Sequence, residues 1–300
     1  MANYSWNGAA GDYLDPTQWT PGDVPLYGSD TTVTVNAGAA TLSNAEPNGI
    51  TLTLGVPPGT AGASPTLLLS NAALGPDMTL DAVGQAVLGV DGYDTNYGTV
   101  NVLPPDTAQF PRSDTLTVSI GAGSQLNQEG TIAVVSPQTV SSRGASLFIT
   151  GAGTLNNDGQ ILVEPGGNAQ FGSNAQVPMS VTGSGTITVD HATASLYGAA
   201  PTQTVDLLGG TLNTSVSLAA TIKDWNNDGS LMFNPSVSIQ SVQFNQTSDA
   251  GGDLQLFGAS GAQVGDLHLL GSYATADFTV GQQTQQGTSI GVSGHPLPSA

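Results

Sequence analysis

The sequence predicts an all-β fold, and within that class a β-solenoid, from two recurring phrases. The stretch LNQEGTIAV at residues 126–134 returns as LNNDGQILV at residues 155–163, an offset of 29 (155 − 126). The stretch ITGAGTL at residues 149–155 returns as VTGSGTI at residues 181–187, an offset of 32 (181 − 149). Phrases that recur at such periods are typical of stacked repeats, and these consist of short strands and glycine turns. A β-sandwich is the alternative fold, which predicts turns at similar spacing but no recurring phrases.

The N-terminal stretch, residues 1–30, is rich in turns and holds two of the three tryptophans. We expect it to cap the stack, whose last strands would otherwise expose apolar side chains and unpaired backbone groups. Strands are predicted from residue 31 onward, because residues 31–36 (TTVTVN) and 50–54 (ITLTL) alternate and are rich in β-branched residues. The prolines at about 84–114 predict loops inserted between strands, since proline does not fit a central strand.

The clearest repeats lie in residues 115–213, where apolar residues alternate and glycine or asparagine marks each corner. Those two residue types accept the positive φ that tight turns require. We therefore predict that the solenoid spans residues 31–245. Residues 246–300 are predicted to be a C-terminal segment of further strands, irregular in pattern, that ends in a polar tail.

The charge balance excludes several classes of partner. The 300-residue chain has 22 acidic residues against three basic ones, Arg112, Arg143 and Lys223, and its net charge is −19. Binding to nucleic acid or to anionic membrane surfaces needs clustered Lys and Arg, so neither is expected. Cysteine is absent, which excludes disulfides. The N-terminus lacks the basic and apolar regions of a signal peptide, and no apolar run approaches a membrane span.

Several stretches resemble β-strand-repeat surface proteins of Gram-negative bacteria, the haemagglutinin-like and autotransporter-passenger-like adhesins. The likeness lies in WNG, DPTQW, VP and DTTV at residues 6–33, in 151–159, 204–212 and 222–229, and in HLLGSYATADF at 268–278. The resemblance implies a right-handed parallel β-helix at the cell surface or in the extracellular matrix, and it brings no catalytic residue. The chain departs from some such proteins in having no array of Gly-Gly-x-Gly-x-Asp calcium repeats.

The best metal candidate is the loop that begins at Asp224. Asp224, Asn226 and Asp228, followed by glycine, match the first half of a Ca²⁺ loop. The twelfth position should be a bidentate Glu but is Pro235, and the same residues also suit a plain Asn-Asp-Gly turn. A second, weaker acidic loop would contain Asp91, Asp94 and Asn96. No cofactor is required by the sequence, and Ca²⁺ is the one ligand that these loops suggest.

Catalysis is not predicted. A lyase acting on acidic sugars needs basic residues, which this chain nearly lacks, and a glycosidase needs two carboxylates about 5–10 Å apart, which many aspartates could meet by accident. The three histidines, His191, His268 and His295, are scattered, with no distinctive Ser, His and Asp grouping. His268 alternates with Leu267 and Leu269, so we expect it to face solvent.

Threonine pairs suggest a further binding role. Stacked on one flat face, they could bind ice or a crystalline polysaccharide. Their irregular spacing favours instead the interpretation that threonine is simply a suitable outward residue on a strand. The pairs are Thr32/Thr34, Thr51/Thr53, Thr115/Thr117 and Thr186/Thr188.

Together these observations predict a secreted or cell-surface structural or adhesive β-solenoid without catalysis. It would contribute to extracellular matrix, biofilm, a surface layer or a self-assembled filament of a Gram-negative bacterium, exported without an N-terminal signal peptide. Its expected partners are further copies, stacked head to tail through the open ends, and surface glycans, with no nucleic acid and no membrane insertion. The alternative is a carbohydrate-binding or carbohydrate-cleaving β-helix protein.

Overall fold

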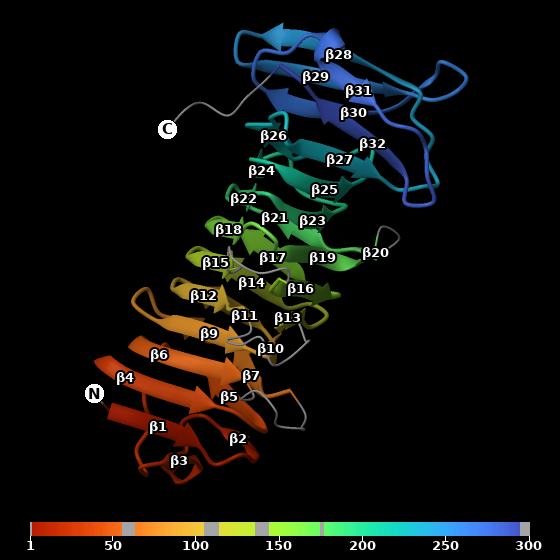
Figure 1. Cartoon of the computed structure of the whole chain (residues 1–300). Coiled ribbons are helices and arrows are strands. Elements are labelled where there is room, and N and C mark those ends of the chain that lie inside the picture. The colour runs from red at the N-terminus through yellow and green to blue at the C-terminus, as the bar shows by residue number, and fades with distance from the viewer. Residues whose placement is uncertain (1, 56–63, 105–113, 136–143, 175–176, 295–300) are drawn as a thin grey trace.

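The computed structural model describes residues 2–55, 64–104, 114–135, 144–174 and 177–294. Within these residues every regular element is a strand, apart from two short 3₁₀ helices, η1 (Pro16–Gln18) and η2 (Thr275–Asp277). Figure 1 shows the strands stacked in layers along one long axis, from the N-terminal end in red to the C-terminal end in blue. The all-β prediction is confirmed.

The longest sheet, sheet A, has 14 strands. From its N-terminal edge the order is β3 (Trp19–Thr20), β1 (Ala2–Trp6), β4 (Tyr27–Val35), β6 (Asn48–Gly55), β9 (Thr79–Val83), β12 (Thr99–Val102), β15 (Thr131–Val134), β18 (Gln160–Val163), β22 (Thr186–Val189), β24 (Thr204–Leu207), β26 (Thr221–Lys223), β30 (Gln263–Leu270), β29 (Gly251–Phe257) and β28 (Ser241–Ser248).

Two further sheets complete the structure. Sheet B contains β2 (Ala10–Asp12), β5 (Ala39–Ser43), β7 (Thr66–Ser70), β10 (Gln85–Val90), β13 (Thr115–Ile120), β16 (Ser146–Gly151), β19 (Asn168–Asn174), β23 (Ala192–Leu196), β25 (Gly210–Thr214), β27 (Gly229–Phe233), β32 (Thr288–Val292) and β31 (Phe278–Val280), with β20 (Val177–Pro178) beside β19. Sheet C contains β8 (Ala73–Leu74), β11 (Tyr93–Asn96), β14 (Gln125–Gln128), β17 (Thr154–Asn157) and β21 (Ser180–Thr182).

The chain visits the sheets in a fixed order. From β6 to β22 each turn of the chain adds a strand to sheet B, then to sheet C, then to sheet A, and from β22 to β27 it alternates between sheets A and B. From β4 to β27 the ladders of all three sheets are parallel, apart from the short β19–β20 pair. Apart from that pair, the antiparallel pairing that a sandwich would show is absent from the described part of this stack, and the arrangement is compatible with a β-solenoid.

The first recurring phrase corresponds to one turn of the stack. Leu126 lies beside Leu155, and Ile132 lies beside Ile161, so both pairs show the predicted offset of 29 (155 − 126 and 161 − 132). These side chains are almost completely buried and belong to one continuous apolar core. The second phrase is not a turn of the stack, because Leu155 pairs with Val181, an offset of 26 (181 − 155). The copy that begins at residue 149 connects sheet B to sheet C, whereas the copy that begins at residue 181 connects sheet C to sheet A.

The corner between sheets C and A explains the glycine in the first phrase. Its two residues are Tyr97-Gly98, Glu129-Gly130 and Asp158-Gly159 in successive turns. A Cβ atom on Gly130 would overlap the carbonyl oxygen of Gly98, and one on Gly159 would overlap that of Gly130. Glycine is therefore required here because successive corners lie in backbone contact.

A column of buried amides lies just inside this corner. Asn96, Gln128, Asn157 and Gln203 are at most 1% exposed. The Asn96 Nδ2 donates to Gln128 Oε1 at 2.8 Å, and Asn157 Nδ2 donates to Gln203 Oε1 at 2.9 Å. Gln203 Nε2 in turn donates to the carbonyl oxygens of Asn157 at 2.7 Å and Thr182 at 3.0 Å. The Asn96–Gln128 and Asn157–Gln203 pairs thus supply partners to each other and to the backbone where water is excluded. Asn96 Oδ1, Gln128 Nε2 and Asn157 Oδ1 have no partner among the described residues.

An aromatic cluster closes the N-terminal end. Trp19 packs edge-on against Trp6, with ring centroids 4.9 Å apart, and against Tyr13, at 4.8 Å. The polar atoms of these side chains are also bonded, since Trp19 Nε1 donates to the Tyr13 carbonyl and Tyr13 Oη donates to that of Pro25. Residues 1–30 also supply ladder strands, because β1 pairs with β4 and β2 pairs with β5, both in parallel.

The C-terminal end is antiparallel, apart from the parallel pairing of β30 with β26, and carries a second aromatic cluster. Strands β28, β29 and β30 extend sheet A, and β32 and β31 extend sheet B. Phe278 lies 5.6 Å from Trp225, 6.0 Å from Phe244 and 5.5 Å from Tyr273, measured between ring centroids. The last parallel ladder of sheet B, between β25 and β27, ends at Phe233.

Two predicted features of the chain are corrected. Residues 85–102, predicted to be inserted loops, form β10, β11 and β12, because the prolines of the 84–114 region lie at 104 and beyond. Residues 105–113 lie outside the described residues, as do Arg112, Arg143 and His295. The polar tail contains strand β32, whose Ile290 is buried against β27.

Candidate functional site

The predicted calcium loop connects β26 to β27 as a compact turn. Asn226 is buried, and its Oδ1 accepts the backbone N–H of Asp228 at 2.9 Å. Asp224 adopts the left-handed region with φ of 54°, and its exposed carboxylate lies 3.7 Å from the ammonium of Lys223. Thus one of the three predicted ligands already caps the turn, and another faces a cation supplied by the chain.

The loop also positions Trp225 in the C-terminal aromatic cluster. Trp225 is 1% exposed, its Nε1 donates to the carbonyl of Gly229 at 3.0 Å, and its own carbonyl accepts from Tyr273 Oη at 3.2 Å. Among the described residues, no group of three or more His, Cys, Asp or Glu side chains is arranged to hold a metal ion. The geometry favours a structural turn, and calcium binding here stays a prediction.

The second acidic set lies on a strand rather than in a loop. Asp94 and Asn96 point into the interior from β11 and are at most 1% exposed, whereas Asp91 is exposed. Asp94 Oδ1 accepts the backbone N–H of Ala72 at 2.7 Å, while its Oδ2 has no hydrogen-bond partner among the described residues. Burial raises the pKa of Asp94, and hydrogen bonds from the backbone oppose that shift only in part.

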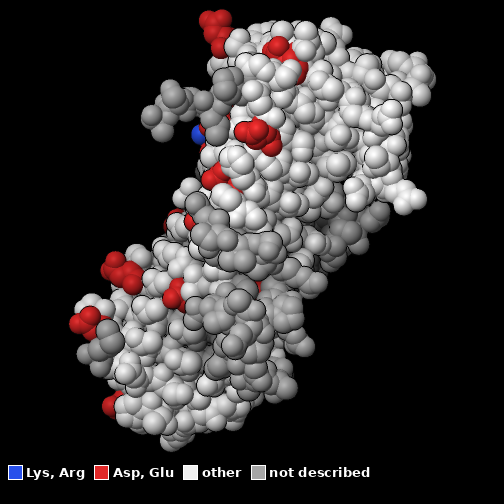
Figure 2. Space-filling view, viewed as in Figure 1, with Lys and Arg blue, Asp and Glu red and all other residues white. Residues whose placement is uncertain are grey.

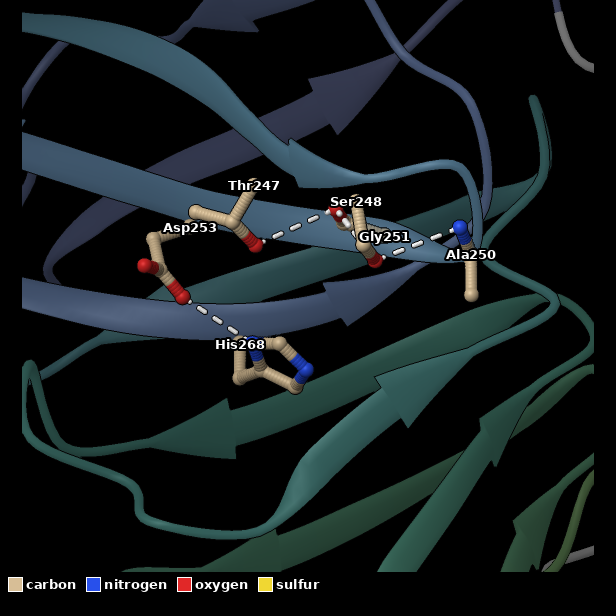
Figure 3. Close-up of polar contacts among 6 residues, drawn as sticks. All are labelled: Thr247, Ser248, Ala250, Gly251, Asp253 and His268. Carbon is tan, nitrogen blue, oxygen red and sulfur yellow. Dashed lines mark hydrogen bonds and ion pairs between the residues drawn. The ribbon is translucent and has the colours of Figure 1, made fainter.

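A carboxylate and an imidazole meet on the C-terminal strands (Figure 3). Asp253 on β29 and His268 on β30 are cross-strand partners, and His268 Nδ1 lies 2.9 Å from Asp253 Oδ1. Thr247 and Ser248 belong to the neighbouring hairpin turn, where both hydroxyls donate to the carbonyl of Gly251. Within the described residues, no hydroxyl is hydrogen-bonded to His268. Its side chain is 44% exposed, which confirms that it faces solvent.

The most extended polar feature is a column of outward residues on sheet A, which we call the threonine column. Cα pairing places one residue from each of nine consecutive strands in register, and eight of the nine are threonine. The column consists of Thr32, Thr51, Thr79, Thr99, Thr131, Gln160, Thr186, Thr204 and Thr221. At about 4.8 Å per strand it extends for roughly 38 Å.

Sequence reasoning missed this column because it relied on spacing along the chain. The offset between register partners varies, from 17 for Val205 and Ile222 (222 − 205) to 32 for Val100 and Ile132 (132 − 100). Strand register removes this variation. Three of the four threonine pairs noted in the sequence lie on sheet A, and the pair Thr115/Thr117 lies on sheet B.

Charged side chains lie beside the threonine column but not within it, since Asp81, Asp206 and Lys223 stand two residues further along their strands. Figure 2 shows isolated acidic residues on a surface that is otherwise mostly uncharged. Near the C-terminal end of sheet A, Lys223 Nζ lies 3.3 Å from Asp206 Oδ1. Burial raises the pKa of Asp206, and the nearby ammonium of Lys223 opposes that rise.

Comparison with protein-family models and with curated proteins gave no match for this chain. In the described residues, no helix has the length and apolar character needed to cross a membrane.

Proposed function

We infer that the three sheets close into a right-handed parallel β-helix, which is the type of β-solenoid that the resemblance to surface adhesins implies. The support is the fixed order in which the chain visits sheets B, C and A from β6 to β22, with parallel pairing between successive turns. Crossover connections between parallel strands of one sheet are right-handed in nearly all proteins. A single shared core along the stack then makes the molecule a stiff rod.

We propose that this rod is a structural or adhesive protein of the cell surface or the extracellular matrix. The observation that carries the proposal is the threonine column, because it presents the same hydrogen-bonding group at nearly every turn over nine strands. A repeating face of this kind suits contact with a repeating partner. The acidic composition and the likeness to Gram-negative adhesins support export to the bacterial surface. Catalysis and a required cofactor are not part of the proposal.

Head-to-tail stacking into filaments is the less favoured form of this function. At the N-terminal end the edge strands are only two and three residues long, in β3 and β2. At the other end, the Thr275 hydroxyl both donates to the carbonyl and accepts from the N–H of Phe244 on the edge strand β28. Short or covered edges disfavour pairing with another chain.

The proposal can be tested on the whole protein. Beads coated with it should be retained on intact extracellular matrix from the producing cells, and immunogold labelling should place it outside those cells. Beads coated with a non-adhesive acidic protein of similar charge serve as the control. Labelling confined to the cell interior, or retention equal to that of the control beads, would remove the proposal.

A second candidate function is the binding of a single oligosaccharide at sheet C. Tyr93 and Tyr97, 68% and 40% exposed, lie on and just after β11. On the neighbouring strands, Asn127 Oδ1 accepts from Gln125 Nε2 and from Asn156 Nδ2. Exposed aromatic rings beside an amide network suit sugar recognition. A glycan array together with a reducing-sugar assay tests both binding and cleavage.

A further inference from the structure

We propose that the threonine column is the binding face for an extended, uncharged polysaccharide with β-linked sugars. This inference rests on the proposed adhesive function and names the partner. The threonine pairs in the sequence suggest two ligands, ice and a crystalline polysaccharide, but their irregular spacing along the chain counts against both. In the structure the threonines lie in register, so their spacing along the chain no longer counts against a polysaccharide.

The neighbouring column on the same strands shows that threonine is not simply what an outward position on this sheet requires. Two positions further along each strand, the register-paired residues are Thr34, Thr53, Asp81, Asn101, Ala133, Leu162, Thr188, Asp206 and Lys223. Both columns project from the same pleated face, yet only three of the nine residues in this one are threonine, and the others are acidic, basic, aliphatic or amide side chains. Strand propensity alone would act on both columns alike.

The hydrogen-bonding groups of the threonine column are available to a ligand. Thr51 and Gln160 are exposed, and the other members are half-buried. In the described part of the chain, no side-chain hydrogen bond links any of the nine to another protein group, since only their backbone atoms are bonded. On sheet B, by contrast, the Thr211 and Ser230 hydroxyls lie 3.1 Å apart and bond to each other.

The charge of the face selects the chemistry of the ligand. The column contains no charged residue, whereas the protein carries a net charge of −19. An anionic polymer would be repelled by that charge, and an uncharged polymer would not. A hydroxyl donates and accepts at once, so a ladder of hydroxyls matches a polymer that offers hydroxyls at a regular interval.

The spacing favours a glycan chain that runs along the rod. Successive hydroxyls are about 4.8 Å apart, a distance close to the advance per sugar of an extended β-linked chain. An ice lattice would need a flat, uncharged face in two dimensions, and the neighbouring column interrupts it with Asp81, Asp206 and Lys223. A single file of hydroxyls suits a linear polymer better.

The test is a binding assay of the full chain on microcrystalline cellulose and on chitin, with alginate as an anionic probe. The variant Thr99→Val/Thr131→Val removes two adjacent hydroxyls from the middle of the column and keeps their β-branched shape. The matched control is Thr117→Val/Thr150→Val, two half-buried outward threonines on the neighbouring strands β13 and β16 of sheet B, whose hydroxyls have no hydrogen-bond partner among the described residues. Both variants should melt close to the wild-type temperature.

We expect the wild type to bind cellulose or chitin but not alginate. The sheet A variant should bind roughly 30-fold more weakly, from the loss of two hydrogen bonds, and the sheet B variant should bind as the wild type does. Equal binding by the sheet A variant, or loss of binding only on Tyr93→Ala, would overturn the inference.

Failure of this inference differs from failure of the proposed function. Wild-type protein that adheres to matrix but binds neither neutral polysaccharide refutes the partner and leaves adhesion intact. Inhibition of ice growth without polysaccharide binding would also refute the partner and assign the column to ice. Absence of adhesion in the bead assay would remove both.

Discussion

The buried amide of Gln203 offers the sharpest test of what holds the stack together. The variant Gln203→Leu keeps a side chain of similar size but removes three hydrogen bonds, which join Gln203 to Asn157 Nδ2, to the Asn157 carbonyl and to the Thr182 carbonyl. A buried hydrogen bond contributes about 1 kcal/mol net, so the variant should lose about 3 kcal/mol of the free energy of unfolding. The Asn157 carbonyl keeps its bond from the Gly185 N–H, which limits the loss there.

The assay is urea unfolding followed by far-UV circular dichroism. Gln160→Leu is the matched control, because Gln160 is an exposed outward residue and its replacement should change stability by no more than about 0.5 kcal/mol. A double variant, Asn157→Leu/Gln203→Leu, should lose less than the sum of the single variants, since it leaves fewer buried groups without partners. A loss below about 1 kcal/mol for Gln203→Leu, or strictly additive effects in the cycle, would refute the reasoning.

Three further predictions concern single positions. Burial raises the pKa of the Asp94 carboxyl group, so the unfolded chain releases the carboxyl proton at a lower pH than the folded protein does. The stability that Asp94 contributes is therefore greatest at low pH and is lost as the pH rises through the pKa of the folded state. Asp94→Asn should therefore raise the urea midpoint at neutral pH and flatten its dependence on pH, and an unchanged pH profile would contradict this. Asn226→Ala should lower stability by about 1 kcal/mol through loss of the bond to the Asp228 N–H. A variant as stable as the wild type would contradict this, and a rise in the wild-type melting temperature on addition of Ca²⁺ would support the predicted metal site. Thr275→Val should uncover the edge at Phe244 and produce oligomers in size-exclusion chromatography with light scattering, whereas a monomer as stable as wild type would show that the edge is protected in another way.

The sequence predicts the stack well where the turns have similar lengths. The phrase that recurs at residues 126–134 and 155–163 gives the observed register of the paired strands. In both copies a strand, a corner glycine and a second strand follow one another with nothing inserted between them. The phrase that recurs at residues 149 and 181 does not give the strand register, because a strand followed by a glycine corner occurs at every edge of the stack. Such a phrase identifies a corner but not which corner it is.

The candidate face could not be read from the sequence for a related reason. The residue numbers of Thr99 and Thr131 differ by 32 (131 − 99), whereas those of Thr204 and Thr221 differ by 17 (221 − 204), yet both pairs are direct neighbours. Only the ladder pairing shows that they belong together. The buried amides were missed because polar residues on strands are normally expected to face outward, and nothing local marks Asn157 as facing inward.

The connections from sheet A to sheet B differ in length more than any other feature of the stack. One consists of Gly84 alone, and others comprise residues 56–65, 103–114 and 135–145. All of them join strands whose register is fixed by their neighbours, so added length at this edge leaves the ladders undisturbed. This edge is therefore the natural place to graft a foreign peptide or a whole folded module, and a row of such grafts would be displayed at nearly regular intervals along one side of the molecule.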